Sequence, residues 1–353
     1  MFDADLDANT PRDKGVSLLF AGIGDARNLY ATLVMITESE LKAPSKRTFQ
    51  ITVNDIKPHV IARNLVIWLL LDELTKNEDS SLEIINAVFF IFCTAIMPAG
   101  TYGRLQSTIS KAIRALETGT GMPSWVKVPS SDHPLVLQVL ESWKNKAPQL
   151  YSNSFFVTET LRAMHRSEPF PMDGYGVPEE CRGEVDCYWR TLALRPPRAL
   201  MHKEELELEK LFRVFDTKKS PSAASKVQTY IEANWKPNVT MFDVEWEKVG
   251  EHFRDNRPDV WRFPDQLFLA SRLPRPKHAS GIFDYVRHFF DFTLSALKNL
   301  EGRLEVRTSV GDITQVLESF RYDPAESIEL LGDEQGEDLS PRKFDRIHLS
   351  NIP

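Results

Sequence analysis

Cysteine is scarce in this 353-residue sequence, and its three cysteines, Cys93, Cys181 and Cys187, cannot form a disulfide framework or a four-cysteine zinc site. So few cysteines are typical of a reducing compartment, so we expect a cytoplasmic or nuclear protein. The eight histidines lack H-x-x-x-H or comparable spacing, and no G-x-S-x-G segment is present. We therefore expect no metal site within this chain and no serine hydrolase.

Long apolar runs and an excess of basic residues are also missing. The most apolar run, 84–97, is about fourteen residues, whereas a membrane span needs about twenty, so it predicts a buried core helix. The net charge of −7 argues against a general nucleic-acid binder and against attraction to anionic membranes. The acidic, polar start of the sequence does not resemble a secretory signal or a mitochondrial presequence. We expect neither a membrane nor a nucleic acid as a partner.

The most informative segment is 16–55. It predicts a strand over 16–21, a turn containing Gly22, Gly24 and Asp25, an apolar helix from Leu29, and a strand over 48–53 that ends at Asn54 and Asp55. Two glycines allow the backbone to approach a ligand closely, and an acid after the second strand can accept both hydroxyls of a ribose. The pattern favours a nucleoside site; the alternative is a tight strand-to-helix turn without a ligand.

Two further strands follow late in the chain. The first covers 303–308 and precedes Gly311 and Asp312; the second covers 344–349 and precedes Ser350 and Asn351. Together with the first two strands they predict an α/β fold with a Rossmann-like parallel sheet. The sheet would be incomplete, because a parallel sheet needs cover at its edge, so we expect either a fragment or a protein partner that completes it.

Between these strands the sequence is mainly helical, and an insertion of this size usually forms a lid or a partner surface. We expect a first part of the sheet domain over 1–75, an inserted helical region over 76–300 and the remainder over 301–353. Aromatic residues concentrated over 235–263 are predicted to pack in a core or lid. The basic run 195–198 with His202 and Lys203, and the run 272–278, suggest either a solvated loop or contact with an acidic partner. One helix is expected before this region, over 59–74. Those expected within it are 81–97, 102–116, 135–143, 154–164, 204–215, 222–235 and 281–300.

The order of these motifs resembles the S-adenosylmethionine-dependent methyltransferases with a Rossmann-like fold. The resemblance implies that Gly22 and Gly24 pass beneath the methionine and ribose, that Asp55 holds the ribose hydroxyls, and that Asp312 faces the adenine amine. The fourth strand would end at the reaction centre with Ser350 and Asn351. S-adenosylmethionine is thus the implied cofactor.

Four segments carry a closer resemblance: LLFAGIGDARNLYATL, VNDIKPHVIARNLVIWLLLDEL, MPAGTYGRLQSTI and FDRIHLSNIP. They are similar to a fungal domain of unknown function that often accompanies MYND zinc fingers and is related to the N-terminal domain of dynein axonemal assembly factors. The resemblance covers about 15–120 and 280–353 and implies a methyltransferase-like fold without proving methyl transfer. This chain has too few cysteines for a MYND finger of its own.

Two departures from the methyltransferase pattern leave two functions open. Phe20 stands where many active relatives carry an acid that pairs with the methionine ammonium, and Asp25 is a substitute only if it does not simply cap the following helix. The final Ser-Asn-Ile-Pro lacks the second proline and the aromatic residue of amine-methylating enzymes. The sequence is compatible with a methyltransferase of unknown acceptor and equally with a non-catalytic assembly or adaptor module.

Overall fold

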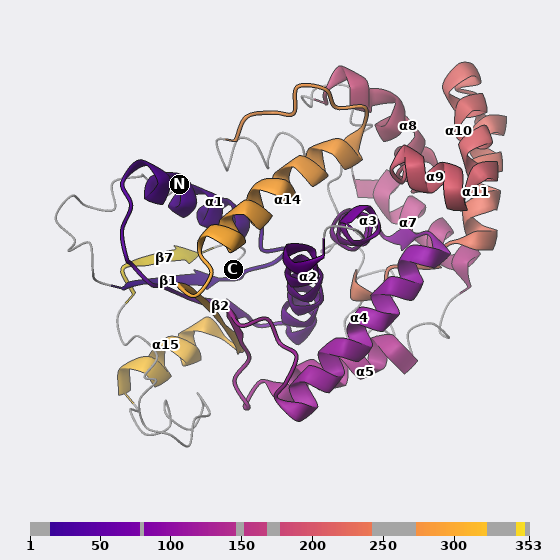
Figure 1. Cartoon of the computed structure of the whole chain (residues 1–353). Coiled ribbons are helices and arrows are strands. Elements are labelled where there is room, and N and C mark those ends of the chain that lie inside the picture. The colour runs from indigo at the N-terminus through magenta and orange to yellow at the C-terminus, as the bar shows by residue number, and fades with distance from the viewer. Residues whose placement is uncertain are drawn as a thin grey trace. The chain divides into compact units, whose positions relative to one another are not determined.

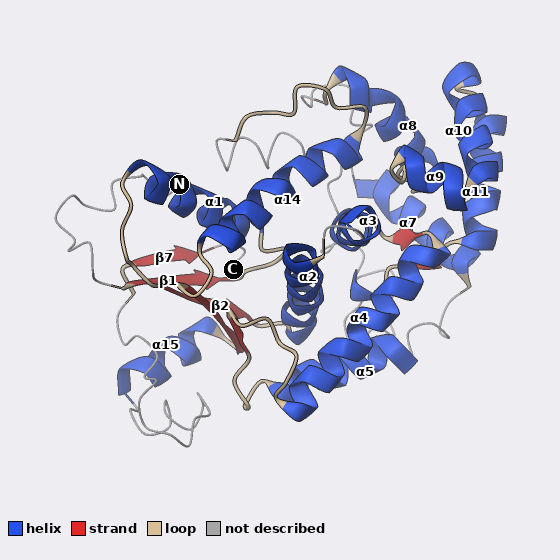
Figure 2. Ribbon diagram, viewed as in Figure 1, coloured by secondary structure: helices blue, strands red, loops and turns tan. Residues whose placement is uncertain are grey.

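The computed structural model describes residues 15–77, 81–145, 152–167, 177–241, 273–322 and 344–349. These residues form a mixed α/β protein with a five-stranded sheet and many helices (Figures 1 and 2). The chain divides into two compact units. Unit 1 comprises Met1–Leu69, Ser110–Glu141 and Phe292–Pro353, and unit 2 comprises Leu70–Ile109 and Ser142–Asp291. The predicted domain boundaries at 75 and 300 stay predictions, because compactness does not show which segments fold independently.

Five strands form the sheet of unit 1: β1 (Val16–Ala21), β2 (Phe49–Asp55), β4 (Val126–Lys127), β6 (Leu304–Val310) and β7 (Arg346–Leu349). Their order is β4-β6-β2-β1-β7, and each neighbouring pair is parallel. The predicted α/β class with a parallel sheet is therefore confirmed. Unit 2 contains one antiparallel pair, β3 (Ile96–Met97) with β5 (Lys236–Pro237).

The remaining elements are helical. The α-helices are α1 (Arg27–Lys42), α2 (Pro58–Lys76), α3 (Ser81–Cys93), α4 (Ala99–Thr118), α5 (His133–Asn145), α7 (Asn153–Ser167), α8 (Arg182–Thr191), α9 (Arg198–Glu204), α10 (Leu206–Lys218), α11 (Pro221–Asn234), α14 (Ile282–Asn299) and α15 (Ile313–Tyr322). Two 3₁₀-helices are η1 (Glu179–Cys181) and η2 (Val239–Met241). No α-helix among the described segments combines the length and the apolar character that crossing a bilayer requires.

Helices cover both faces of the sheet in unit 1. Figure 1 shows α1 and α15 on opposite faces. This arrangement follows from the strand order, because the β1–α1–β2 and β6–α15–β7 connections cross the sheet in opposite directions and such crossovers are right-handed. Every residue of β1 is buried, as expected for a strand covered on both faces. The carboxylate of Asp345 accepts the Ser17 N–H at 2.8 Å and helps to align β7 with β1.

The core of unit 2 surrounds α3, which is buried from Ile84 to Cys93. Edge-to-face ring pairs join Phe89 to Phe283, Phe90 to Trp235, and Phe92 to Phe290, with centroids 5.3–5.5 Å apart. Trp235 thus lies in the core, as predicted; the later members of its aromatic cluster fall outside the described residues.

Helix α3 ends at Cys93, four residues before the predicted end, because its last carbonyl groups accept hydrogen bonds from side chains. The Thr94 hydroxyl donates to the Phe90 carbonyl at 2.8 Å. The fully buried Asn238 side chain donates to the carbonyls of Phe90, Ile91 and Thr94 at 2.7–3.3 Å. Its oxygen accepts the N–H and the hydroxyl of Thr240. The Asn238 side chain therefore provides hydrogen-bond partners both for carbonyl groups at the end of α3 and for Thr240 in the turn that follows.

The structure corrects two interpretations of residues 181–204. The segment between Cys181 and Cys187 reads from the sequence alone as a charged loop, but it forms the start of α8; Cys181 ends η1, and both thiols are buried. The basic run from Arg195 is a solvated loop only in part: Arg198, His202 and Lys203 are exposed, but Arg198–Glu204 form α9, and Arg195 lies 4.9 Å above the ring of Phe212. Both helices are short, so their periodic pattern spans too few turns to stand out.

We expect Asn238→Asp to lower the free energy of unfolding by about 3 kcal/mol or more, and by more than Asn238→Ala. The aspartate places a carboxylate oxygen against the three carbonyl oxygens that now accept hydrogen bonds, whereas alanine only removes the donors. Urea denaturation of both variants measures the difference. The control is Asn299→Asp at the exposed end of α14, for which we expect a loss below about 1 kcal/mol. Equal losses at the two sites would contradict the role given to Asn238.

Candidate functional site

The candidate site lies at the carboxyl ends of the parallel strands in unit 1, where the turn after β1 has a left-handed backbone. Gly22 has φ 68°, Gly24 φ 54° and Ala26, which precedes α1, φ 59°. Glycine adopts these angles at little cost, whereas alanine is strained there. In this turn the Ile23 N–H donates to the Asn54 carbonyl at 3.0 Å and the Ala26 N–H to the Ile23 carbonyl at 3.1 Å. The residues that the sequence singled out as a glycine turn therefore form a tight left-handed turn that is bonded to the end of β2.

Asp55, the last residue of β2, supplies an anion to this turn. Its Oδ2 accepts the Gly24 N–H at 3.2 Å, and its Oδ1 accepts the Lys57 N–H at 3.1 Å. The residue is buried, with 8% of its surface exposed. Each carboxylate oxygen can accept more than one hydrogen bond, so capacity remains for further donors. The structure thus brings together Gly22, Gly24 and Asp55, as the sequence predicted.

A second layer of amide side chains holds the turn and the strand ends in place. Asn64 on α2 donates to the Gly24 carbonyl at 2.8 Å, and Asn54 donates to the carbonyls of Ser309 and Gly311 at 3.1 and 3.0 Å. Both asparagines are buried. The Gly311 N–H donates to the Asp55 carbonyl at 3.0 Å, which joins the ends of β2 and β6 directly.

Asp132 is a buried carboxylate at the same edge that the sequence analysis missed. Its Oδ2 accepts the Thr308 hydroxyl at 3.1 Å and its Oδ1 the Val310 N–H at 3.3 Å. Only 6% of the residue is exposed, and burial raises the pKa of Asp132 above its ordinary value despite these two hydrogen bonds. Its neighbours Ser130, Ser131 and His133 carry no motif, so only the tertiary structure reveals its position.

The other predicted site residues differ in their environments. Asp25 accepts the Arg27 N–H at 3.2 Å and forms an ion pair with the Arg27 guanidinium at 2.8 Å. Asp312 is exposed and accepts the Thr314 N–H at 2.7 Å, so it caps α15. Its neighbour Gly311, with φ 147°, contacts the end of β2 through its backbone. Ser350 and Asn351 lie outside the described residues.

Phe20 occupies the position at which the methyltransferase pattern has an acid. It is 1% exposed, and its ring centroid lies 5.6 Å from that of His348, its partner in the β1–β7 register. Burial lowers the pKa of His348 below its ordinary value, so the imidazole is neutral at pH 7. This pair offers aromatic and neutral surface, not a negative charge.

Ile56 is exposed directly beside the buried carboxylate. Its exposed fraction is 62%, although Asp55 before it is buried. An exposed isoleucine next to a carboxylate offers apolar surface to a flat ligand, and covering it would gain roughly 1 kcal/mol or more. The sequence analysis gave Ile56 no role, because a single apolar residue between a strand and a helix carries no pattern.

Metal-ligating side chains do not gather in the described part of the chain: no group of three or more His, Cys, Asp or Glu residues is arranged to hold an ion there. Cys93, Cys181 and Cys187 are all buried, and burial raises the pKa of Cys187 to about 12. Its thiol is therefore protonated and unreactive at neutral pH.

Comparison with known families gives one match, to a domain of unknown function (DUF4470), over residues 3–96. This segment includes the glycine turn and Asp55. Searches of curated proteins and of solved structures find no significant match. The link to a domain of unknown function has support, whereas the relation to MYND-associated proteins and dynein assembly factors stays a prediction.

The raised pKa of Asp132 predicts a pH-dependent cost to stability. A carboxyl group whose pKa is higher in the folded than in the unfolded protein does not lower the free energy of unfolding below its unfolded pKa, about 3.9. The free energy of unfolding falls as the pH rises from there through the folded pKa. We expect Asp132→Asn to gain stability relative to the parent protein between pH 4.5 and pH 7.5.

Urea denaturation at both pH values measures this relative gain. The asparagine keeps an acceptor for the Val310 N–H, and the Thr308 hydroxyl can rotate to accept from its amide. Asp72→Asn on α2 serves as the control, because this carboxylate is only partly buried and forms an ion pair with Lys76 at 2.7 Å. A stability difference for Asp132→Asn that stays constant or falls with pH would show that burial does not penalise this carboxylate.

Proposed function

We propose that the turn at Gly22–Gly24 and the carboxylate of Asp55 bind the nucleoside part of S-adenosylmethionine, and that the protein is a methyltransferase of unknown acceptor. The observation that carries the proposal is the Asp55 carboxylate at 3.2 Å from the Gly24 N–H, at the end of a parallel strand. A carboxylate beside a left-handed glycine turn is the arrangement that a ribose with two neighbouring hydroxyls requires.

The strand order supports a Rossmann-like assignment. The four longer strands lie in the order β6-β2-β1-β7, which is third, second, first and fourth along the chain. This is the strand order at the centre of doubly wound nucleotide-binding sheets. The order reverses beside β1, and in open parallel sheets ligands bind in the crevice at the carboxyl ends of the strands at such a reversal. The turn containing Gly22 and Gly24 begins at that point.

The chain's own groups have separable tasks in this proposal. Asp55 accepts hydrogen bonds from the ribose hydroxyls, Gly24 allows the ligand to approach the backbone, and Ile56 covers one face of the base. Asn64 and Asn54 keep the turn and the strand ends in position. S-adenosylmethionine itself supplies the activated methyl group. The protein would contribute mainly by orienting the cofactor and the acceptor and by excluding water.

The methionine part of the cofactor fits less well. Its ammonium group needs a negative partner, but Phe20 and the neutral His348 fill the position of the usual acid. Asp25 is the nearest carboxylate in sequence, and its charge is paired with Arg27. These contacts favour a second candidate function, in which the fold is a non-catalytic assembly or adaptor module that binds a protein partner.

Calorimetric titration of S-adenosylmethionine into the protein tests the proposal. We expect saturable binding at or below millimolar cofactor, and a dissociation constant at least about ten-fold higher for Asp55→Asn. Losing hydrogen bonds to a charged group costs about 1.5–3 kcal/mol, and each 1.4 kcal/mol corresponds to a factor of ten. Thermal unfolding of each variant separates a loss of binding from a loss of structure.

Asp72→Asn is the matched control, since it removes the same charge from an ion pair on α2 and should leave cofactor affinity unchanged. No saturable binding to the folded parent protein at millimolar cofactor would remove the cofactor proposal and leave the adaptor function. Equal weakening by both substitutions would show that Asp55 acts only through net charge.

A further inference from the structure

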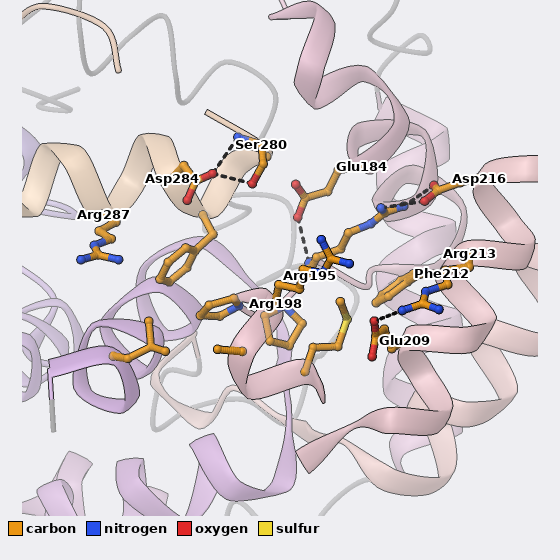
Figure 3. A pocket seen from close by; sticks show the side chains of 17 residues that line it. Glu184, Arg195, Arg198, Glu209, Phe212, Arg213, Asp216, Ser280, Asp284 and Arg287 are labelled. Carbon is orange, nitrogen blue, oxygen red and sulfur yellow. Dashed lines mark hydrogen bonds and ion pairs between the residues drawn. The ribbon is translucent and has the colours of Figure 1, made fainter. Parts of the chain in front are cut away.

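Unit 2 contains a pocket that the proposed function does not use. Its volume is about 590 Å³, within the range of small-molecule sites, and its walls come from α8, α9, α10, α14 and the Arg195-Pro196-Pro197-Arg198 segment (Figure 3). Four arginines and four carboxylates line it together with apolar side chains. The formal charge of the pocket is therefore balanced. Which groups are left to bind a ligand depends on which of these side chains already have partners.

All four carboxylates are engaged within the protein. Glu184 accepts the backbone N–H groups of Arg195 and Ile282 at 2.8 and 2.9 Å, one on each oxygen. Asp284 accepts the N–H and the hydroxyl of Ser280 at 2.7 and 2.6 Å.

The remaining two carboxylates pair with arginines. Asp216 forms a bidentate ion pair with Arg195, and Glu209 pairs with Arg213 and with His202. Each of the four carboxylates thus already has hydrogen-bond or ion-pair partners within the protein.

The other two arginines that line the pocket are Arg198 and Arg287. Arg198 is exposed and has no ion pair or hydrogen bond among the described residues. Arg287 approaches Asp291 only to 3.8 Å, beyond hydrogen-bonding distance. Figure 3, which draws the lining residues, marks the interactions of Arg195 and Arg213 with their partners. The guanidinium groups of Arg198 and Arg287 thus keep hydrogen-bond donors for a ligand, and such donors suit an anion.

Arg198 begins a helix, and the surface beside it is apolar. Pro197, whose own φ is restricted, has φ −51° and ψ 139° and leads directly into α9, so Arg198 has the backbone of the first helical turn. Phe212, Phe283 and Met201 are buried side chains that contribute apolar wall, and Arg195 lies over the Phe212 ring. A small anion without an apolar part would leave the side chains of Phe212, Phe283 and Met201 without contact to the ligand.

We propose that this pocket binds a small organic anion with an apolar body, and that Arg198 pairs with its carboxylate or phosphate. A guanidinium accepts either group in the same bidentate geometry, so both anions share one recognition chemistry. The apolar body lies against Phe212, Phe283 and Met201. The site is separate from the glycine turn of unit 1, and the inference does not depend on cofactor binding there.

Calorimetry with the full chain tests the site, using 4-phenylbutyrate and phenyl phosphate as probes. We expect at least one of them to bind saturably, and Arg198→Gln to raise its dissociation constant about ten-fold, because charge-assisted hydrogen bonds to the guanidinium are lost. Binding of only one probe identifies the preferred anion. The neutral 4-phenylbutyramide and the short anion acetate should each bind at least about ten-fold more weakly than the better probe.

Arg182→Gln is the matched control, because Arg182 lies on the same unit, pairs with Glu179 and does not line the pocket. The Arg182→Gln variant should bind the probes with the affinity of the parent protein. Circular dichroism establishes that this variant and Arg198→Gln are folded. The proposal is overturned if neither probe binds, if the amide binds as tightly as the carboxylate, or if both arginine variants lose affinity equally.

Discussion

The parallel pairing of β2 with β6 is the constraint on which the arrangement of unit 1 depends. Seven residues of each strand are in register, from Phe49 opposite Leu304 to Asp55 opposite Val310. This register places Asn54 against Gly311, 257 positions later in the chain, while Asp132 reaches the end of β6 from the other side, after β4. On the opposite edge of β2, a shift by one residue against β1 would turn Asp55 away from the glycine turn, because successive strand side chains point to opposite faces. The candidate site is therefore a consequence of strand register.

Within that arrangement Asp55 has two roles that compete for the same oxygens. As a structural group it holds the turn through Gly24 and the start of α2 through Lys57. As a ligand-binding group it must offer its remaining lone pairs to hydroxyl donors. The two roles are compatible for a carboxylate, which has about four acceptor positions, but not for most other side chains. This explains how one residue can serve either a nucleotide-binding enzyme or a stable scaffold with the same fold, and why its geometry alone does not separate them.

Much of the fold could be predicted from local patterns, whereas the chemistry around it could not. Continuous apolar runs and the glycine turn gave β1, β2 and their parallel arrangement, and long amphipathic periods gave α4 and α14. The short helices α8 and α9 were missed because about two or three turns produce no clear period. Asp132 and Ile56 were missed for another reason: their positions matter only through segments distant in sequence. Asp312 was found, but its exposed side chain caps a helix, a role that sequence order cannot distinguish from ligand contact.

The distance along the chain between β2 and β6 also has a consequence for synthesis. β1 and β2 leave the ribosome about 250 residues before β6, which at about 5–20 residues per second is roughly 12 to 50 seconds. Until then β2, buried on nearly all its residues in the finished protein, lacks the strand that covers one of its edges. An unpaired apolar strand is a template for pairing with other chains. Early packing of α1 and α2, or binding of a chaperone, would protect this strand during the interval.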